Sequence, residues 1–500
     1  MEYKDPFSKE SREIAVMLDK ATDSRDSKAI IELIKKAEVL EKSQDSFNRA
    51  QLSYSIGTAY GDLSVVDDYY GQEECLEKQI FYFRYSIDTI ENEVELEECF
   101  LPYVNGLKQV LFTNAGSCLD ACGRKIAAIQ MYFKALEINN KFGMVIGNLG
   151  MTYRHYALLV SDFGHRDYLN YFAYHNLKYA MKSNDVHKEA KEYFSQALDL
   201  YDVDYINKVL EPDLNIPQFR YDGKEEKYRR WCLNNHLFLN PLNDLNICEE
   251  YFAADVIQLP NMVLRIDDKP VCYGMFNQLK QEYVYARFLF YEVYNCNDNI
   301  HFADKETYLV NFADYPQYSI RIEKLKTAYR ILYSLLDKAA YFLNRYFELG
   351  IDERDVSFRS IWHSEKTGRN GYKYKNILKP EENYAIRALY WIRKDFYECI
   401  HTAIQPKAKF FCDLRNALEH KYVKVFAEWA SDRSNGEIDD LAFYISEDRL
   451  VDAVLKMLRI MREVIMNISF AVKIEENKRY NGLENMPKIY LDIYDDEWKI

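Results

Sequence analysis

Arg415 and His420, two residues with chemically useful side chains, lie five positions apart in the C-terminal part of the sequence. An arginine carries a permanent charge on a planar group that suits phosphate. A histidine can both take and give a proton near neutral pH. Asn416 follows the arginine directly, and Tyr422 lies two positions beyond the histidine. These residue types suit acid–base chemistry beside a phosphate.

The spacing sets a geometric condition on this chemistry. If residues 407–426 form a helix, as we predict, Asn416 and His420 are four positions apart and share one face. Arg415 then lies about 140° from His420, since five steps of about 100° separate them. We therefore expect the long arginine side chain, or a helix start near this point, to place the guanidinium on the same side as His420.

The pattern is short, and the sequence holds a second instance at Arg230 and His236. There the residue after the arginine is Trp231, and an Asn-Pro loop follows. We interpret this second instance as a decoy. For Arg415 and His420, the alternative is a salt-bridged surface arginine and an unrelated core histidine.

Local charge separates this segment from the rest of the chain. Residues 383–426 contain eight Lys or Arg and four Asp or Glu, a balance of +4, whereas the whole chain carries −14. A basic patch beside the motif would attract a phosphate backbone. The RNA-binding candidates are Arg387, Arg393, Lys394, Lys409, Lys421 and Lys424. The alternative is an ordinary solvated helix face, with the interleaved aromatic residues packed in the core.

Composition restricts the class of protein that positions these residues. The chain has 500 residues and is 48% hydrophobic, so it can form large cores and is not mostly disordered. Its 17 Gly and 11 Pro are few, which favours long helices over a many-turned all-β fold. The net charge of −14 argues against a globally cationic nucleic-acid binder.

Several signatures are missing from the sequence. We find no secretory signal at the N-terminus, and no apolar window approaches the roughly 18 residues of a membrane span. The ten cysteines are scattered, with Cys118 and Cys122 closest together and no zinc spacing among them. Phosphate-loop, HExxH and GxSxG motifs are absent. We expect reduced core thiols in a cytoplasmic protein without a membrane partner, metal or cofactor.

The segment 10–210 reads as helical, and its packing positions recur at the period of a helix–turn–helix repeat, about 34 residues. Gly116 and Tyr132 belong to one copy, and the same shift from Gly116 leads to Gly150. Small residues let paired helices approach closely, and aromatic residues fill the gap between them. The pattern resembles the tetratricopeptide family, which implies stacked helix pairs with a concave surface for a protein partner.

The repeat is irregular, since the separation between Gly57 and Gly116 is not a multiple of this period. We therefore expect insertions at 64–74 and 165–175. The alternative is a set of ordinary helix pairs without a ligand groove.

We predict an all-α protein in three parts. Residues 1–210 form the repeat domain, 211–310 a connecting region, and 311–500 a helical bundle with a tail. The connecting region begins with a linker at 211–223 and contains a short β-hairpin at 262–274. Apolar spacing predicts bundle helices, and the intervening segment 358–376 is a polar loop. The predicted bundle helices are 318–347, 382–400, 407–426 and 448–474. The acidic, aromatic tail at 489–500 is either a short strand or an arm lying on a partner.

In this helical setting, the motif resembles the HEPN family (higher eukaryotes and prokaryotes nucleotide-binding domain) over about residues 300–475. The resemblance implies a metal-independent RNA endonuclease, with Arg415, Asn416 and His420 as catalytic residues. Two protomers would form one composite site. Tyr422 extends the match to a form found in HEPN toxins paired with nucleotidyltransferase antitoxins, where a nearby tyrosine can be modified.

The resemblance also implies a mechanism. His420 would act as general base or acid while the ribose 2′-OH attacks, which leaves 2′,3′-cyclic phosphate and 5′-OH ends. The repeats would gate the nuclease, in a bacterial toxin or phage-defence role. The alternative is a non-enzymatic adaptor whose repeats bind a protein partner and whose bundle serves for dimerisation or nucleotide binding.

Overall fold

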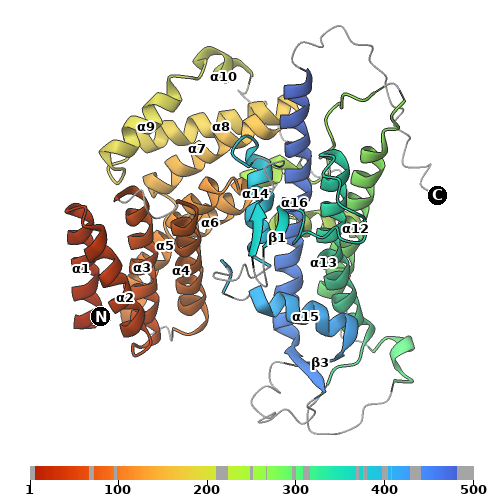
Figure 1. Ribbon diagram of the computed structural model, residues 1–500, viewed down its shortest axis with the longest axis horizontal. Coiled ribbons are helices and arrows are strands. Elements are labelled where there is room, and N and C mark those ends of the chain that lie inside the picture. The colour runs from red at the N-terminus through yellow and green to blue at the C-terminus, as the bar shows by residue number, and fades with distance from the viewer. Residues whose placement is uncertain are drawn as a thin grey trace.

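The computed structural model shows an all-α protein, as the sequence predicts, to which two small two-stranded sheets are added (Figure 1). The structure describes residues 6–66, 72–94, 98–209, 223–247, 252–265, 267–295, 300–307, 316–367, 371–374, 378, 380–396, 404–406, 408–427 and 441–480. The elements up to the connecting region are α1 (Lys9–Asp23), α2 (Ser27–Glu41), α3 (Ser46–Val66), α4 (Gln72–Asn92), η1 (Glu98–Phe100), α5 (Leu101–Ala121), α6 (Lys125–Ile138), α7 (Gly143–Leu159), α8 (Phe163–Lys182), α9 (Lys188–Leu198) and α10 (Val203–Val209). The remaining elements are α11 (Gly223–Asn234), η2 (Pro241–Leu245), α12 (Val271–Tyr294), η4 (Phe302–Asp304), α13 (Ile320–Tyr346), β1 (His363–Thr367), β2 (Gly371–Tyr374), α14 (Tyr384–Arg393), α15 (Ala408–His420), β3 (Tyr422–Phe426), β4 (Ala442–Ser446) and α16 (Glu447–Tyr480).

Helices α1 to α10 form an array of neighbouring helix pairs, coloured red to yellow in Figure 1. Helix α3 packs along α4, α5 along α6, and α7 along α8. A Cβ atom on Gly57 would lie 2.7 Å from the ring of Phe83, and one on Gly116 would lie 2.6 Å from the ring of Tyr132. Real carbon atoms do not approach so closely. The prediction that small residues bring paired helices together under aromatic rings is therefore confirmed.

The predicted insertion at 165–175 is wrong, because these residues lie within α8, where Leu169, Ala173 and Tyr174 are buried. Of the other insertion, 64–66 end α3 and 72–74 begin α4, while 67–71 lie outside the described residues. The array varies in helix length and is continuous through α8. Its assignment to the tetratricopeptide family stays a prediction.

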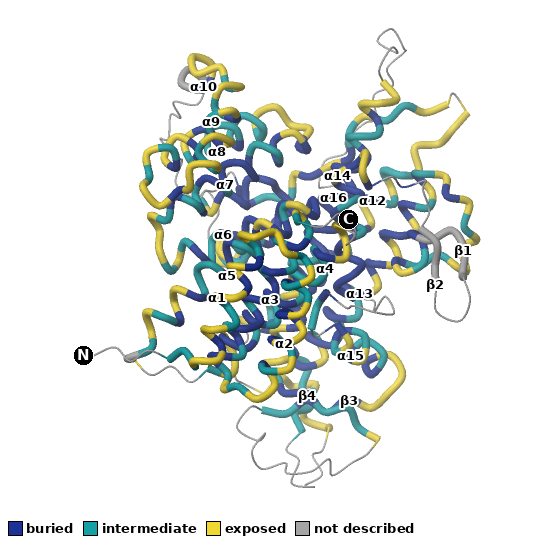
Figure 2. Tube along the Cα trace, turned by 60° about the vertical axis from the view of Figure 1, so that its left-hand side comes forward, coloured by how far each residue is buried: buried dark blue, intermediate teal, exposed yellow. Residues whose placement is uncertain are grey.

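The bundle is organised around α16, the long blue helix in the middle of Figure 1, whose central part is buried in Figure 2. Every residue from Met461 to Val472 is buried. A helix buried on all sides needs partners on all sides. Helix α16 contacts α12, α13 and α14 of the bundle and also α7 of the repeat array, so the two halves share one packed interior.

Two predictions about local structure before α14 are wrong. No strand is present among the described residues of 262–274, because Val271 begins α12 and buried Phe276, Leu279 and Tyr283 continue its helical spacing. The polar loop predicted at 358–376 instead contains the antiparallel pair β1 and β2. The Asn370-Gly371 pair in the sequence is a hairpin signal and indicates such a turn.

The helix predicted at 407–426 also ends early. Helix α15 stops at His420, and the next residues form β3, which pairs in parallel with β4. Val423 and Val425 are buried in this strand, and β-branched residues favour strand geometry. The backbone N–H of Gln317, just before α13, donates to the Val425 carbonyl at 2.7 Å. The motif therefore lies at a helix-to-strand junction tied to the start of α13.

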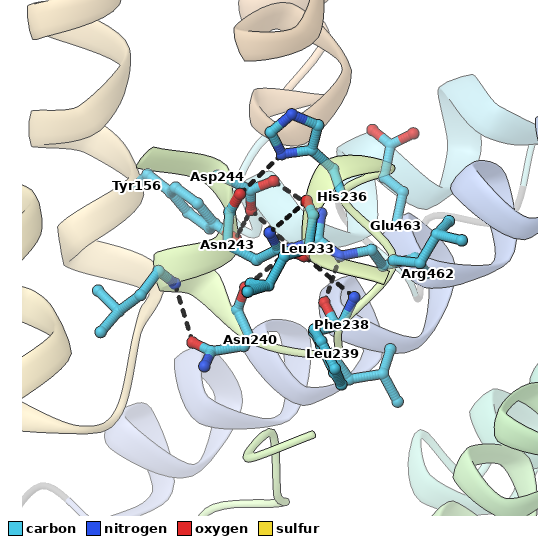
Figure 3. A network of polar contacts seen from close by, with 12 residues as sticks. Tyr156, Leu233, His236, Phe238, Leu239, Asn240, Asn243, Asp244, Arg462 and Glu463 are labelled. Atoms are coloured by element: carbon cyan, nitrogen blue, oxygen red, sulfur yellow. Dashed lines mark hydrogen bonds and ion pairs between the residues drawn. The ribbon is translucent and has the colours of Figure 1, made fainter. Parts of the chain in front are cut away.

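The connecting region joins the repeats to the bundle through a buried carboxylate, shown in Figure 3. Asp244 of η2 accepts hydrogen bonds from Arg462 of α16 at 2.7 and 3.0 Å. It also accepts one from the Tyr156 hydroxyl of α7 at 2.9 Å. Arg462 donates in addition to the backbone oxygens of Phe238 and Asn240. All four guanidinium bonds lie in the protein interior, so this network holds three parts of the chain together.

Other predictions concern the ends of the regions and the thiols. The predicted linker lies outside the described residues apart from Gly223, which begins α11, and the tail at 489–500 lies wholly outside them.

Four free cysteines are buried, as predicted for core thiols: Cys75, Cys118, Cys122 and Cys232. Burial raises the pKa of the Cys118 thiol to about 12, which makes it unreactive at neutral pH.

Candidate active site

The motif occupies the last two turns of α15, a helix with one apolar face. Phe411, Leu414, Ala417 and Leu418 are buried, while His420 and its neighbour Glu419 are exposed. The buried Tyr329 hydroxyl of α13 donates to the Phe411 carbonyl at 2.8 Å. Apolar packing together with this hydrogen bond fixes α15 against α13.

Arg415 is held by groups on both sides. One guanidinium N–H group (Nη1) donates to Asn416 Oδ1 at 3.0 Å. The guanidinium carbon lies 5.8 Å from the ring centroid of Tyr333, a cation–π contact with α13. Asn416 in turn directs its Nδ2 towards the Cys412 thiol at 3.7 Å. The arginine is half-buried, and its orientation is set before any ligand arrives.

His420 is the last residue of α15 and is exposed to solvent. Among the described residues, no hydrogen bond joins His420 to Arg415. The helix continues unbroken between them, so no helix start lies near this point, and the described contacts of the guanidinium are with Asn416 and Tyr333. The arrangement offers a cation held against α13 and a separate imidazole facing outward.

Tyr422 begins β3 and is 45% exposed, so it is accessible. Its hydroxyl lies 2.8 Å from the hydroxyl of Tyr318, which precedes α13. The ammonium of Lys424 lies 5.3 Å from the Tyr422 ring centroid. The tyrosine next to the motif histidine is thus open to solvent on the strand side of the junction.

The predicted basic patch does not form as one surface. Lys409 and Lys421 on α15 and the adjoining turn are exposed, and Arg387 on α14 is half-buried. Lys424 is only 5% exposed. Arg393 at the end of α14 and Lys394 directly after it are also buried. Including these three in an RNA-binding surface was therefore wrong.

The reason lies in the docking of α14 onto the repeats. Lys394 forms ion pairs with Glu73 and Glu77 of α4. Arg393 is buried and donates from Nε to the Arg359 carbonyl at 3.2 Å. The charge of Lys394, directly after α14, therefore serves the contact between the two halves of the protein, and Arg393 serves a contact within the C-terminal half.

The second Arg/His instance has separate structural roles. Arg230 is exposed and pairs with Glu226 at 2.6 Å on α11. The His236 ring bonds the Asn243 carbonyl at 2.8 Å and stacks on Phe133 of α6. Burial lowers the pKa of His236, so it is neutral at physiological pH. These contacts agree with its interpretation as a decoy.

A cavity of about 230 Å³ lies beside His236, away from the residues of α15. Asn243, which lines it, already uses its amide in hydrogen bonds to the backbone of Phe238 and Leu233. No grouping of three or more His, Cys, Asp or Glu side chains suited to a metal ion occurs in the described ranges.

Tyr333 and Cys412, whose side chains contact Arg415 and Asn416, were not among the predicted site residues. Tyr333 lies next to Leu332, off the apolar stripe that predicted α13. Its position one helical turn after Tyr329, which also contacts α15, was the available signal.

Residues 263–475 match the family model described as LA2681-like HEPN. This match supports a HEPN domain that includes α12 to α16 up to residue 475 and therefore the whole motif. No curated protein and no solved structure matches significantly. In the part of the chain that the structure describes, no helix is long and apolar enough to cross a membrane.

Proposed function

We propose that the protein is a metal-independent RNA endonuclease with Arg415, Asn416 and His420 as its catalytic residues. The observation that carries this proposal is the position of all three on one helix of a segment that matches a HEPN family, with the histidine exposed. HEPN domains are often ribonucleases, and the match supports the proposal of a nuclease or nucleotide-related role.

The chemistry assigns one task to each side chain. The ribose 2′-OH attacks the adjacent phosphorus, and His420 takes the hydroxyl proton or protonates the leaving 5′-oxygen. Arg415 stabilises the negative charge that develops on the phosphate. Asn416 orients Arg415, because its side-chain oxygen accepts the guanidinium hydrogen bond. The products carry 2′,3′-cyclic phosphate and 5′-OH ends.

A second copy of the chain completes the site in this proposal. Arg415 is held against α13 and His420 is exposed to solvent, so the histidine is accessible to a second copy of the chain. Packing two α15 helices together would bring the histidine of one copy near the arginine of the other. A homodimer is therefore the proposed active form, and single-stranded or looped RNA is the proposed substrate.

The remaining parts have proposed roles as well. Residues 1–210 hold a protein partner and gate the nuclease, in a toxin or phage-defence setting. Tyr422 is the proposed site of regulatory modification. We propose that the bundle starts near residue 263 and not at 311 as predicted, because α12 packs on α13 and α16 and the family match also begins there.

The test is RNA cleavage in EDTA by the full-length protein, compared with His420→Ala, Arg415→Ala and Arg230→Ala. Arg230→Ala is the matched control, because it removes an arginine of the decoy. Wild type and Arg230→Ala should cut RNA and leave cyclic phosphate ends, while the two motif variants should be inactive. Equal cleavage by all four proteins would point to a contaminating nuclease and contradict the proposal. Inactivity of all four, with RNA or a protein partner still bound, would favour the adaptor.

A further inference from the structure

Two adjacent residues after α14 face opposite halves of the protein. Asp395 contacts the repeats, and Phe396 contacts the helices of the bundle. Their backbone N–H groups donate to the Ile392 and Arg393 carbonyls at 3.0 and 3.1 Å. This turn fixes the backbone of both residues to the end of α14, so the positions of the two side chains depend on one another.

Asp395 is held by two arginines of the repeat array. Arg124 donates to it at 2.6 Å, and Arg84 forms an ion pair with its other oxygen. Arg124 also donates to Glu463 of α16 at 2.7 and 3.2 Å. Arg124, Asp395 and Glu463 are each no more than 5% exposed. Two positive and two negative groups form this buried cluster, which balances its charge.

The α5–α6 turn that carries Arg124 also contacts the backbone of α14. A Cβ on Gly123 would lie 2.5 Å from the Tyr384 carbonyl oxygen, and the residue has a φ of +81°. Glycine is therefore the residue that permits this close approach. The ion pairs and the backbone contact together seat α14 on the repeats.

Phe396 continues the contact into the candidate active site. Its ring lies 6.0 Å from the ring of Tyr333 on α13 and 6.0 Å from that of Phe411 on α15, both edge-on. Tyr333 is the same ring that lies under the Arg415 guanidinium. Phe396 is 3% and Tyr333 is 6% exposed, so neither ring can move without repacking its neighbours.

We propose that Asp395, Phe396 and Tyr333 are positioning residues through which the repeat array sets the orientation of Arg415. This inference rests on the proposed function, because it gives the regulation of that same site. Contact between the repeats and Asp395 holds Phe396 in place, and Phe396 packs edge-on against the Tyr333 ring, over which the guanidinium lies. A partner that shifts the α5–α6 turn would act on Arg415 by this route, without touching α15 itself.

The test uses full-length protein and two variants, one at each end of the proposed route from the repeats to Arg415. Asp395→Asn removes the charge that binds Arg124 and Arg84, and Tyr333→Leu removes the ring under Arg415. Tyr333→Phe keeps that ring and serves as the conservative variant. Asp244→Asn is the matched control, since it breaks an equally buried carboxylate–arginine contact with α16 at a different place.

The first readout is the alkylation rate of Cys412 by iodoacetamide, resolved by peptide mass spectrometry. Cys412 is a half-buried thiol in α15 beside Asn416, whereas buried Cys118 and Cys232 report general opening. Asp395→Asn and Tyr333→Leu should raise the Cys412 rate by about tenfold relative to those two thiols, and Tyr333→Phe should not. The double variant Asp395→Asn/Tyr333→Leu should raise the Cys412 alkylation rate by less than the product of the two single increases, since both changes act on one route.

The second readout is RNA cleavage, in which Asp395→Asn and Tyr333→Leu should lower kcat more than they raise KM. An increase in Cys412 reactivity that Asp244→Asn reproduces, or no increase at all, would overturn the inference. The thiol readout does not need cleavage. If wild type fails to cut RNA while the Cys412 effect is present, the nuclease assignment falls and the coupling between the repeats and α15 stands.

Discussion

Arg415 donates a 3.0 Å hydrogen bond to Asn416, its own neighbour on α15, while His420 is exposed one turn further along the same helix. A polar residue after the arginine therefore acts on the arginine itself. The guanidinium enters any complex already oriented, which reduces the cost of fixing it when a phosphate binds.

Asn416→Ala should lower RNA cleavage by about 10- to 100-fold, because a misplaced catalytic group loses on the order of 10² in rate. The variant leaves the guanidinium present but without its side-chain acceptor. Single-turnover cleavage would measure the change, with Asn148→Ala in the repeats as the control. Full activity of Asn416→Ala beside an inactive Arg415→Ala would show that Asn416 has no part in catalysis.

Arg415→Lys should be nearly as inactive as Arg415→Ala. Lysine keeps the charge but lacks the planar fork and the fixed direction that the cation–π contact with Tyr333 gives. Loss of one charge-stabilising group costs about 10²- to 10³-fold in kcat. Arg230→Lys is the matched control. Wild-type kcat for Arg415→Lys would mean that charge alone suffices.

Gly116→Ala should destabilise the repeat array, because the new methyl group would lie 2.6 Å from the Tyr132 ring. Gly106→Ala on the same helix is the matched control, since nothing lies within 4 Å of its Cβ position. The control should be neutral or stabilising by about 0.5–1 kcal/mol, as expected for alanine in place of glycine in a helix. Urea unfolding followed by circular dichroism would compare them. Equal midpoints would contradict close packing of α5 on α6.

Asp244→Asn should lower the thermal midpoint more than any exposed ion-pair change. Removing one partner of a buried pair costs about 3–5 kcal/mol, because the remaining charge of Arg462 stays buried. Glu282→Gln breaks the half-exposed contact with Lys338 and should cost no more than about 1 kcal/mol. Differential scanning fluorimetry of both variants would check the order. The reverse order would show that the network in Figure 3 does not hold the halves together.

Stability should depend on pH through Asp395. Burial by itself would raise the pKa of this carboxyl, but Arg124 and Arg84 outweigh burial and hold it below its ordinary value. The ionised carboxylate therefore contributes its full stabilisation above the pKa of the unfolded state, about 3.9. This contribution is lost as pH falls through the lower pKa of the folded state.

Asp395→Asn cannot titrate at this position. The difference in thermal midpoint between wild type and this variant should therefore be constant from about pH 7 to 5 and shrink below about pH 4. Midpoints measured across that range, with Asp244→Asn in parallel, would test the sign. A difference that grows on acidification would contradict the ion pair between Asp395 and the repeats.

The sequence was sufficient for features that depend on local periodicity. The helical class, the glycine–aromatic packing at Gly57 and Gly116, and the long buried C-terminal helix all follow from residue spacing within one segment. The end of α15 at His420 did not, because the strand that follows it is stabilised by pairing with Ala442–Ser446, which is distant in sequence.

In the candidate site, too, features set by local spacing were predicted and features set by contacts distant in sequence were not. The motif residues were found from their types and spacing on one helix. The prediction of a basic RNA-binding patch was wrong for Lys394. This residue instead pairs with Glu73 and Glu77, which lie far earlier in the sequence. Charge counts along a segment do not say which charges another part of the chain will neutralise. Tyr333 was missed because its spacing from Tyr329 indicates a shared helix face but does not show that the ring lies under Arg415, which only tertiary packing determines.

Arg462 and Glu463 are consecutive residues of α16, and they bind Asp244 and Arg124 of segments that the ribosome makes far earlier. During synthesis, those earlier charges lack these partners until α16 emerges from the exit tunnel. The repeats and the connecting region can therefore reach their final packing only after the motif helix has itself been translated. The proposed nuclease site would stay unassembled on the nascent chain until then, and a chain that ends before α16 would lack a finished interior.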